Sequence, residues 1–255
     1  MTITKMFDLD GKVALITGAS RGIGASIANV LSEFGASVIL SSRNKENLQK
    51  IELNIKNNGG IATSITCNSG EIVQIKSLFK KIDRNFGRLD ILVNNSATNP
   101  FYGNVLDADE KAWDKTINVN LKGPFFISQI AAKFMRENQG GSIVNISSIN
   151  GRIPLHYQSI YSITKAAMIS MTQSFAKELG RENIRVNAVL PGLTDTKFSS
   201  VLTDNNDFMR EMLKKIPLGR IAQPDEISGV VLFLVSEAAS YVTGSTFNVD
   251  GGILA

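Results

Sequence analysis

Short runs of apolar residues alternate along the chain with longer stretches in which apolar residues recur at helical spacing. The short runs are rich in Val, Ile and Leu and hardly alternate with polar residues, which is typical of strands covered by helices on both faces. They occupy residues 13–17, 37–41, 61–67, 89–93, 142–147, 184–190 and 246–249. The pattern therefore predicts a series of buried parallel strands.

Between these runs, apolar stripes of helical period end at glycines. The first stripe begins at Ile23 and ends at Gly35, and the third ends just before Gly87. A glycine directly after the last apolar residue is a common helix end. Regular alternation of strand and helix predicts an α/β fold of the doubly wound kind, a parallel sheet flanked by helices. Since no linker or repeat interrupts the pattern, we expect a single domain over residues 1–255.

Composition and charge narrow the classes of function. The 255 residues include 27 Lys and Arg against 23 Asp and Glu, a formal net charge of +4, without a basic block that would indicate a nucleic-acid partner. The longest apolar run, 230–235, is too short for a membrane span, and the N-terminal residues lack the apolar core of a signal peptide. One cysteine, Cys67, and one histidine, His156, cannot supply a four-ligand zinc site. We therefore expect a cytosolic protein with no metal, nucleic-acid or membrane partner.

A glycine-rich turn follows the first predicted strand and opens the first predicted helix. It reads Thr-Gly-Ala-Ser-Arg-Gly-Ile-Gly over residues 17–24. Glycines at such a place let the backbone approach a diphosphate, whose charge is stabilised by free N–H groups and by the positive end of the helix dipole. The order Gly-x-x-x-Gly-x-Gly differs from the common dinucleotide pattern. The strand before it and the helix after it nevertheless favour a dinucleotide-binding turn.

The same turn also contains Gly-x-Ser-x-Gly, the pattern of the nucleophile elbow in serine hydrolases. That enzyme class needs a histidine base late in the chain, and the sequence offers only His156, five residues before a stronger catalytic candidate. The elbow would also lie on the first strand, with no earlier strands to build the hydrolase sheet. We therefore disfavour a hydrolase and interpret His156 as a half-exposed loop residue that lines a pocket.

A tyrosine and a lysine are the strongest candidates for acid–base chemistry. Among the four tyrosines, only Tyr161 has a lysine four positions later, at Lys165. This spacing places both side chains on one face of a helix, ~6 Å apart along its axis. A fixed ammonium near a phenol favours the phenolate, so we expect Lys165 to lower the pKa of Tyr161 from ~10 toward ~7. Such a phenol can give or take a proton at neutral pH.

Further residues accompany this pair and the glycine turn in a fixed order along the chain. They are Asn94-Asn95, Asn120, Ser148 (thirteen residues before Tyr161) and Pro191-Gly192. In this order and spacing the set resembles the short-chain dehydrogenase/reductase family, over about residues 11–252. The resemblance implies a Rossmann-type fold with seven parallel strands, a nicotinamide cofactor, and a homo-oligomer that is a tetramer or a dimer.

The resemblance also implies a role for each matched residue. Tyr161 would donate the proton in carbonyl reduction or accept it in alcohol oxidation, and Lys165 would lower its pKa and hydrogen-bond the nicotinamide ribose. Ser148 would hydrogen-bond the substrate oxygen. Asn120 would hold a water that links Lys165 to solvent, unless it is only a helix residue at a kink. The implied cofactor-binding residues are Gly18, Ser20, Arg21, Gly22, Ile23, Gly24, Ser42, Arg43, Asn68, Asn95, Tyr161, Lys165, Pro191, Gly192, Leu193 and Thr196.

Two positions depart from the family's pattern. The family's Asn-Asn-Ala-Gly reads Asn94-Asn95-Ser96-Ala97, so alanine replaces a glycine that lets the backbone pass close to the cofactor ribose. The acidic residue often found near the adenine is Asn68, whose amide can still hydrogen-bond the ring. Neither departure removes a catalytic group.

The residues after the second predicted strand indicate which cofactor is used. Members that prefer NAD usually carry an acidic residue there, which holds the ribose 2′-hydroxyl. Here the sequence is Leu40-Ser41-Ser42-Arg43, without a carboxylate. Arg43 and Arg21 offer two guanidinium groups suited to a 2′-phosphate. We therefore predict NADP(H).

The expected substrate is a small ketone or aldehyde. Residues 99–102 and 112–116 resemble the carbonyl-reductase branch of the family, and they are equally compatible with 3-oxoacyl-carrier-protein reductases of fatty-acid synthesis. A non-catalytic dinucleotide sensor is disfavoured, because Ser148, Tyr161, Lys165 and Asn120 are all present. We expect a polar flap over residues 193–206. The expected substrate pocket comprises Ser148, Gly151, Arg152, Ile153, Leu155, His156 and Tyr157, and Phe101, Trp113, Phe125 and Phe126 are expected in the core or at an interface.

Overall fold

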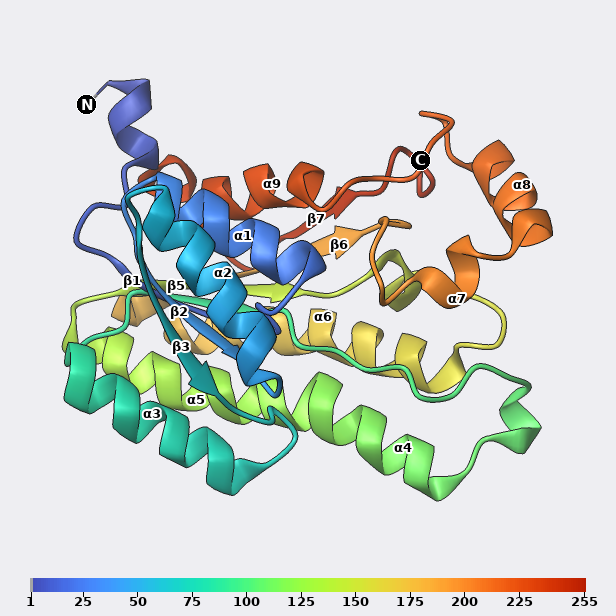
Figure 1. The fold of residues 1–255 in the computed structure, drawn as a ribbon, viewed down its shortest axis with the longest axis horizontal. Helices are drawn as coiled ribbons and strands as arrows, with labels where there is room; N and C mark the ends of the chain where they lie inside the picture. Colours follow the sequence, from blue (N-terminus) through green and yellow to red (C-terminus); the bar gives the residue numbers. More distant parts are fainter. Residues whose placement is uncertain (1) are drawn as a thin grey trace.

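Seven parallel strands form one sheet in the computed structural model, which describes residues 2–255 (Figure 1). The strands are β1 (Val13–Thr17), β2 (Ser37–Ser42), β3 (Ile61–Thr66), β4 (Ile91–Asn94), β5 (Gly141–Ile146), β6 (Ile184–Pro191) and β7 (Thr246–Val249). Their order is β3-β2-β1-β4-β5-β6-β7, and all six pairings are parallel. The predicted doubly wound, Rossmann-type single domain is confirmed, although Met1 lies outside the described residues.

Helices cover both faces of this sheet (Figure 1). One face carries α1 (Gly22–Glu33), α2 (Lys45–Asn57) and α9 (Asp225–Val235), and the other carries α3 (Ile72–Phe86), α5 (Gly123–Glu137) and α6 (Ser159–Leu179). The remaining α-helices are α4 (Glu110–Ile117), α7 (Ser200–Thr203) and α8 (Asn206–Lys215). Short 3-10 helices are η1 (Ile3–Phe7), η2 (Val105–Asp107), η4 (Ile149–Gly151), η5 (Gly180–Glu182) and η6 (Glu237–Ala239), and a π-helical turn, η3 (Asn118–Lys122), joins α4 to α5.

Two hydrophobic cores lie above and below the sheet, because successive strand residues point to opposite faces. In β1, Ala14 and Ile16 pack into the core under α1, α2 and α9, whereas Leu15 packs into the core under α3, α5 and α6. Both sets of positions are shielded from water. This explains the continuous apolar runs in the sequence.

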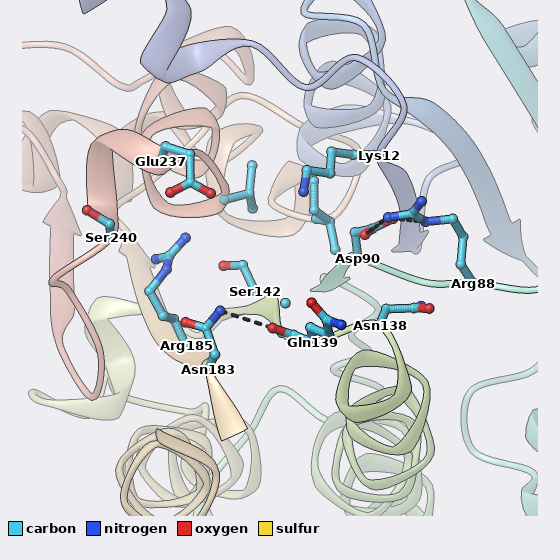
Figure 2. Close-up of a pocket in the computed structure, with 14 residues that line it drawn as sticks. Lys12, Arg88, Asp90, Asn138, Gln139, Ser142, Asn183, Arg185, Glu237 and Ser240 are labelled. Carbon is cyan, nitrogen blue, oxygen red and sulfur yellow. Dashed lines mark hydrogen bonds and ion pairs between the residues drawn. The ribbon is translucent and has the colours of Figure 1, made fainter. Parts of the chain in front are cut away.

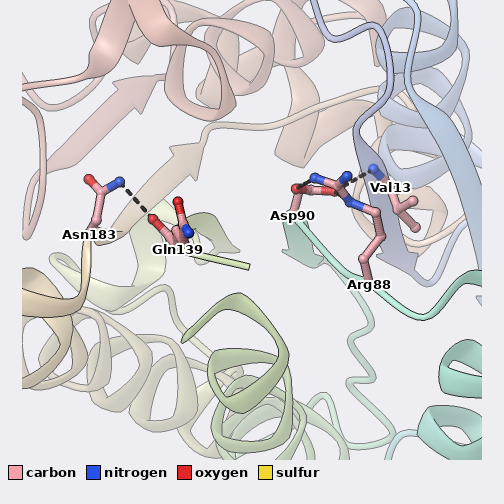
Figure 3. A network of polar contacts seen from close by, with 5 residues as sticks. All are labelled: Val13, Arg88, Asp90, Gln139 and Asn183. Carbon is pink, nitrogen blue, oxygen red and sulfur yellow. Dashed lines mark hydrogen bonds and ion pairs between the residues drawn. The ribbon is translucent and has the colours of Figure 1, made fainter. Parts of the chain in front are cut away.

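The amino ends of the strands are tied together by polar contacts (Figure 3). Asp90, just before β4, accepts a hydrogen bond from the backbone N–H of Val13 at 2.9 Å and another from Arg88 Nη2 at 2.6 Å. Asn183 Nδ2 donates to the backbone oxygen of Gln139 at 3.1 Å. These contacts fix the register of the edge that lies opposite the carboxyl ends of the strands.

A small polar pocket of about 160 Å³ lies at the same edge (Figure 2). One of its cations, Arg185, donates to the backbone oxygens of Ser236 at 3.1 Å and Val242 at 3.4 Å. Burial lowers the pKa of Arg185, and the nearby charge of Glu237 opposes that shift. Since Arg88, Asp90 and Arg185 hydrogen-bond within the chain, we interpret this pocket as structural.

The four aromatic residues that the sequence places in the core or at an interface are half-buried (Phe101 and Phe126) or exposed (Trp113 and Phe125). Trp113 is 43% exposed and Phe125 is 40% exposed, so a core position is wrong for both. Phe125 packs edge-on against Phe126 and Phe175, with ring centroids 5.4 Å and 5.2 Å apart. Each has too few covering neighbours in one chain, which leaves the interface as the open interpretation.

No helix within residues 2–255 combines the length and the apolar character that a bilayer crossing requires.

Candidate active site

A cavity of about 1120 Å³ opens at the carboxyl ends of the strands. This is the edge at which ligands bind in open α/β sheets. All sixteen residues predicted to bind the cofactor line it: Gly18, Ser20, Arg21, Gly22, Ile23, Gly24, Ser42, Arg43, Asn68, Asn95, Tyr161, Lys165, Pro191, Gly192, Leu193 and Thr196. The fold thus gathers residues from most of the chain's length around one space, while their contacts to a cofactor stay predictions.

The glycine turn between β1 and α1 has no room for a side chain at Gly18 or Gly24. Gly18 has a φ of +67°, and a Cβ on Gly24 would lie 2.4 Å from the Gly18 backbone oxygen. Asn95 holds the turn, since its Nδ2 donates to the backbone oxygens of Thr17 at 3.1 Å and Gly18 at 3.2 Å. Arg21, the N-cap of α1, makes no side-chain cap. The first N–H groups of α1 are therefore free to bind an anion.

The Ser-Ala pair that replaces the family's Ala-Gly fits beside this turn without backbone strain. Ala97 does not adopt a positive φ, so a glycine is not required at its position. Ser96 lies against the turn, where a Cβ on Gly18 would be 3.0 Å from its Cα. Its hydroxyl accepts a hydrogen bond from Ser69 Oγ at 3.1 Å. The departure therefore adds a polar link between the loops after β3 and β4.

Ser148, Tyr161 and Lys165 meet at the floor of the cavity. Tyr161 and Lys165 project from the same face of α6, and the Lys165 Nζ lies 5.5 Å from the centroid of the Tyr161 ring. Lys165 is only 2% exposed, and its Nζ donates to the backbone oxygen of Ile146 at 2.7 Å. Ser148, at the start of η4, is hydrogen-bonded to the Tyr161 phenol. The structure thus brings the three predicted residues together, while their catalytic roles stay predictions.

Asn120 lies behind the cavity rather than in its wall. It sits in the π-helical turn η3 and is fully buried. Its Nδ2 donates to the Thr98 backbone oxygen at 2.9 Å and to Thr164 Oγ1 at 3.2 Å, and its Oδ1 accepts from the Thr98 N–H at 2.8 Å. Both side-chain N–H groups of Asn120 therefore already have acceptors. The predicted water would have to donate a hydrogen bond to an oxygen of Asn120. Its position in an irregular helical turn also matches the alternative of a residue at a kink.

The predicted pKa shift of Tyr161 is wrong in direction. Burial raises the pKa of Tyr161 to about 12, and the hydrogen bond with Ser148 opposes this shift. Burial also lowers the pKa of Lys165 to about 7, so the ammonium that was expected to stabilise a phenolate is itself disfavoured. The spacing in the sequence indicated that the two groups are neighbours, but not that both are removed from water.

The buried lysine makes stability depend on pH. Its pKa is about 7 in the folded protein and 10.5 when unperturbed, so between these values the unfolded chain binds more protons and the free energy of unfolding rises with pH. From about pH 7 to pH 10 we expect wild type to gain up to about 4 kcal/mol relative to Lys165→Met. Urea unfolding of both proteins at several pH values measures this gain. Parallel pH profiles would contradict the buried, uncharged lysine.

The substrate side of the cavity agrees only in part with the predicted pocket. Ser148, Ile153, Leu155 and His156 line it, and His156 is an exposed loop residue as interpreted. Gly151, Arg152 and Tyr157 do not line it.

Each of the three has a physical reason to lie elsewhere. Gly151 packs against α6, where a Cβ would lie 2.8 Å from the Lys165 backbone, and Arg152 donates to Thr246 Oγ1. Tyr157 has a φ of +65° and packs on Tyr102, with ring centroids 5.8 Å apart. The 3-10 helix η4 and the turn at Tyr157 are local features for which the sequence carries no clear signal.

The predicted flap is more ordered than a polar loop. Residues 193–206 contain α7 and lead directly into α8, and Thr194 forms a parallel bridge with Ala222 at the flap's base. Phe198 brings its ring to 5.7 Å from the ring of Tyr161. The sequence missed several lining residues outside the flap and pocket: Tyr102, Asn150, Gln158, Phe208, Met212, Lys215, Ile253 and Leu254. Most lie far along the chain from the catalytic residues, where spacing gives no signal.

Comparison with known proteins decides the family. Residues 18–254 match the family model described as enoyl-(acyl carrier protein) reductase. Dehydrogenase/reductase SDR family member 4 of Homo sapiens is 37% identical over 250 residues, with 98% of this chain and 90% of that protein covered. The chain belongs to the short-chain dehydrogenase/reductase family. It is thus an oxidoreductase of a family that uses nicotinamide dinucleotides and acts on small molecules.

Two further relatives show how far this short-chain dehydrogenase/reductase resembles its family. The 3-oxoacyl-[acyl-carrier-protein] reductase of Thermotoga maritima is 40% identical over 252 residues, with 96% of this chain and 99% of that protein covered. A gluconate 5-dehydrogenase from Burkholderia cenocepacia, solved in complex with NADP and tartrate, superimposes with a TM-score of 0.95 at 31% identity, covering 99% of each chain. The match extends over the whole fold, including α8 and the C-terminal segment.

Proposed function

We propose that this short-chain dehydrogenase/reductase is an NADPH-dependent carbonyl reductase, which converts a ketone or aldehyde to an alcohol. One observation carries the proposal: Ser148, Tyr161 and Lys165 meet in the cavity that also contains the uncapped glycine turn at α1. A proton donor and an anion-binding turn on one cavity would serve carbonyl reduction, since the turn can bind the dinucleotide diphosphate and the donor can protonate the substrate oxygen.

Tyr161 would donate the proton to the substrate oxygen. With a pKa raised to about 12, its phenol stays protonated at neutral pH, as a donor must. The bound nicotinamide would supply the hydride. The Ser148 hydroxyl would donate a hydrogen bond to the substrate oxygen as negative charge develops there. Its hydrogen bond with Tyr161 keeps the two hydroxyl groups aimed at the same place.

Lys165 would stabilise the phenolate that Tyr161 becomes. Its pKa near 7 lets it hold a proton once a negative charge forms beside it, and its Nζ is held within the site by the Ile146 backbone oxygen. In this scheme Asn120 holds the water through which Lys165 exchanges protons with solvent. The lysine therefore acts after the proton transfer, in place of the initial pKa lowering expected from the sequence.

Two arginines support NADPH as the cofactor. Arg21 and Arg43 are exposed, line the cavity and form no ion pair within the described part of the chain. A 2′-phosphate would give both guanidinium groups a partner. NADP in the Burkholderia cenocepacia neighbour adds support for this choice.

A second candidate is reduction of a 3-oxoacyl group on a carrier protein. It is favoured by the 40% identity to the 3-oxoacyl-[acyl-carrier-protein] reductase and by the description of the matching family model. The assay that tests both follows NADPH absorbance with a panel of ketones, a 3-oxoacyl thioester and a 3-oxoacyl carrier protein. Turnover of free ketones supports the carbonyl reductase, and turnover confined to the carrier-bound substrate supports the alternative. Dinucleotide binding without any turnover would support the disfavoured sensor.

We also propose that the protein is a homo-oligomer, a tetramer or a dimer. Trp113 and Phe125, both more than a third exposed on α4 and α5, offer an aromatic surface that a second copy would cover. The cytosolic location stays a prediction.

A further inference from the structure

The charges in the cavity are all of one sign. Within residues 2–255, the lining contains no Asp or Glu. It contains five basic side chains: Arg21, Arg43, Lys165, Lys197 and Lys215. The proposed function uses the first three, for the cofactor phosphate and for the proton transfer. The remaining two, Lys197 and Lys215, have no role in the proposed function.

One of the two remaining lysines lies in the flap and the other lies beyond it, at the end of α8. Lys197 follows Thr196, whose methyl carbon would be 3.2 Å from a Cβ on Gly22, so it lies beside the glycine turn where the cofactor would bind. Lys215 ends α8, and α8 also presents Phe208 and Met212 to the cavity. Lys215 is therefore the cation on the apolar, substrate side.

The chain around Lys215 is held rigidly. The next residue, Ile216, is 4% exposed and packs on the C-terminal segment, where a Cβ on Gly251 would lie 2.7 Å from its Cγ2. Leu218 N–H donates to the Gly251 backbone oxygen at 3.1 Å. The acidic side chain in that segment, Asp250, accepts hydrogen bonds from the Gly252 N–H at 2.9 Å and from the Leu254 N–H at 3.2 Å. The backbone of Lys215 is thus fixed beside the cavity.

The other cations of α8 differ from Lys215 in having partners. Lys214 Nζ lies 2.7 Å from Glu211 Oε1, and Arg210 Nη1 lies 3.5 Å from Asp207 Oδ1. Among the residues that the structure describes, Lys215 has no carboxylate within ion-pair distance. Both lysines are exposed, but Lys214 is paired with Glu211, whereas Lys215 lines the cavity without a carboxylate partner among the described residues.

We infer that the substrate is a carbonyl compound with an apolar body and a carboxylate, and that Lys215 binds this carboxylate. This inference rests on the proposed function and deepens it. The apolar body would contact apolar side chains of the flap and of α8 that line the cavity, namely Phe198, Leu202, Phe208 and Met212. A charge-assisted hydrogen bond to the carboxylate would fix the orientation of the carbonyl toward Tyr161. Because no lining carboxylate competes for Lys215, the substrate supplies the missing charge.

A matched series of substrates tests this inference. The probes are 4-oxopentanoate, 5-oxohexanoate and 7-oxo-octanoate, each beside its methyl ester, with NADPH and with wild type, Lys215→Met and Lys214→Met. For at least one chain length we expect wild type to prefer the acid over the ester by about tenfold or more in kcat/KM. Lys215→Met should lose this preference through a higher KM for the acid and leave the ester unchanged. The Lys214→Met control should behave as wild type.

The possible outcomes distinguish a failure of this inference from a failure of the proposed carbonyl reductase function. Equal kcat/KM for acid and ester at every chain length in wild type would overturn the inference that the substrate carries a carboxylate. The proposed carbonyl reductase activity would stand. An equal loss on both acid and ester in Lys215→Met would show a structural effect and also overturn it. Absence of turnover with every probe and every neutral ketone would overturn the proposed function and the inference together.

Discussion

Replacing Tyr161 by phenylalanine is expected to lower kcat for carbonyl reduction by about 1000-fold or more, in the range typical of losing a positioned acid. The phenyl ring keeps the packing against Phe198, whose ring centroid lies 5.7 Å away, and removes only the hydroxyl. We therefore expect the fold and NADPH affinity to persist. Steady-state rates measure the first effect, and NADPH fluorescence titration measures the second.

Tyr157→Phe is the matched control for this substitution. Tyr157 is 54% exposed, lies four residues earlier and does not line the cavity, so its loss of a hydroxyl should leave kcat unchanged. If Tyr161→Phe kept a tenth or more of the wild-type rate, another group would have to supply the proton. The assignment of Tyr161 as the donor would then be wrong.

Removing both Arg21 and Arg43 is expected to raise the KM for NADPH by about 100-fold, because each guanidinium would form charge-assisted hydrogen bonds with the 2′-phosphate. The KM for NADH, which lacks that phosphate, should change little. The Arg21→Ala/Arg43→Ala double variant, assayed with both cofactors, measures the difference. The variant should thus lose its preference for NADPH over NADH but keep its activity.

Arg136→Ala supplies a control for the lost charge, since Arg136 pairs with Glu182 on the surface at 2.6 Å and does not line the cavity. An unchanged KM for NADPH in the double variant would mean that both arginines are solvated surface charges. An equal rise in the KM for NADH would indicate that the substitutions damage the glycine turn.

The fold could be predicted from the sequence because each strand is buried on both faces and leaves an uninterrupted apolar run. The boundaries were less secure where a polar residue serves the structure. Leu89 is fully buried and apolar, yet β4 begins only at Ile91, and Asp90 between them directs its carboxylate to Val13 and Arg88. Burial alone therefore does not define a strand.

The parts of the candidate site that depend on the order and spacing of residues along the chain could be predicted from the sequence. The parts that depend on tertiary packing could not. The positions of Ser148, Tyr161 and Lys165 are fixed by one strand end and one helix, so their proximity followed from the sequence. The direction of the pKa shift of Tyr161 did not, because it depends on burial by segments far along the chain. Lys215 was missed for the same reason: the position of α8 at the cavity depends on tertiary packing, such as that of Ile216 against Gly251 in the C-terminal segment.

Transfer of a deuterium label tests the central claim most directly. Wild type would be incubated with a ketone that it turns over and with NADPH deuterated in turn at each of the two C4 positions, and the alcohol would be analysed by mass spectrometry. We expect the alcohol to gain one deuterium from one of the two labelled cofactors and none from the other, since one face of the nicotinamide would meet the carbonyl. An alcohol without deuterium from either cofactor would contradict hydride transfer in this cavity.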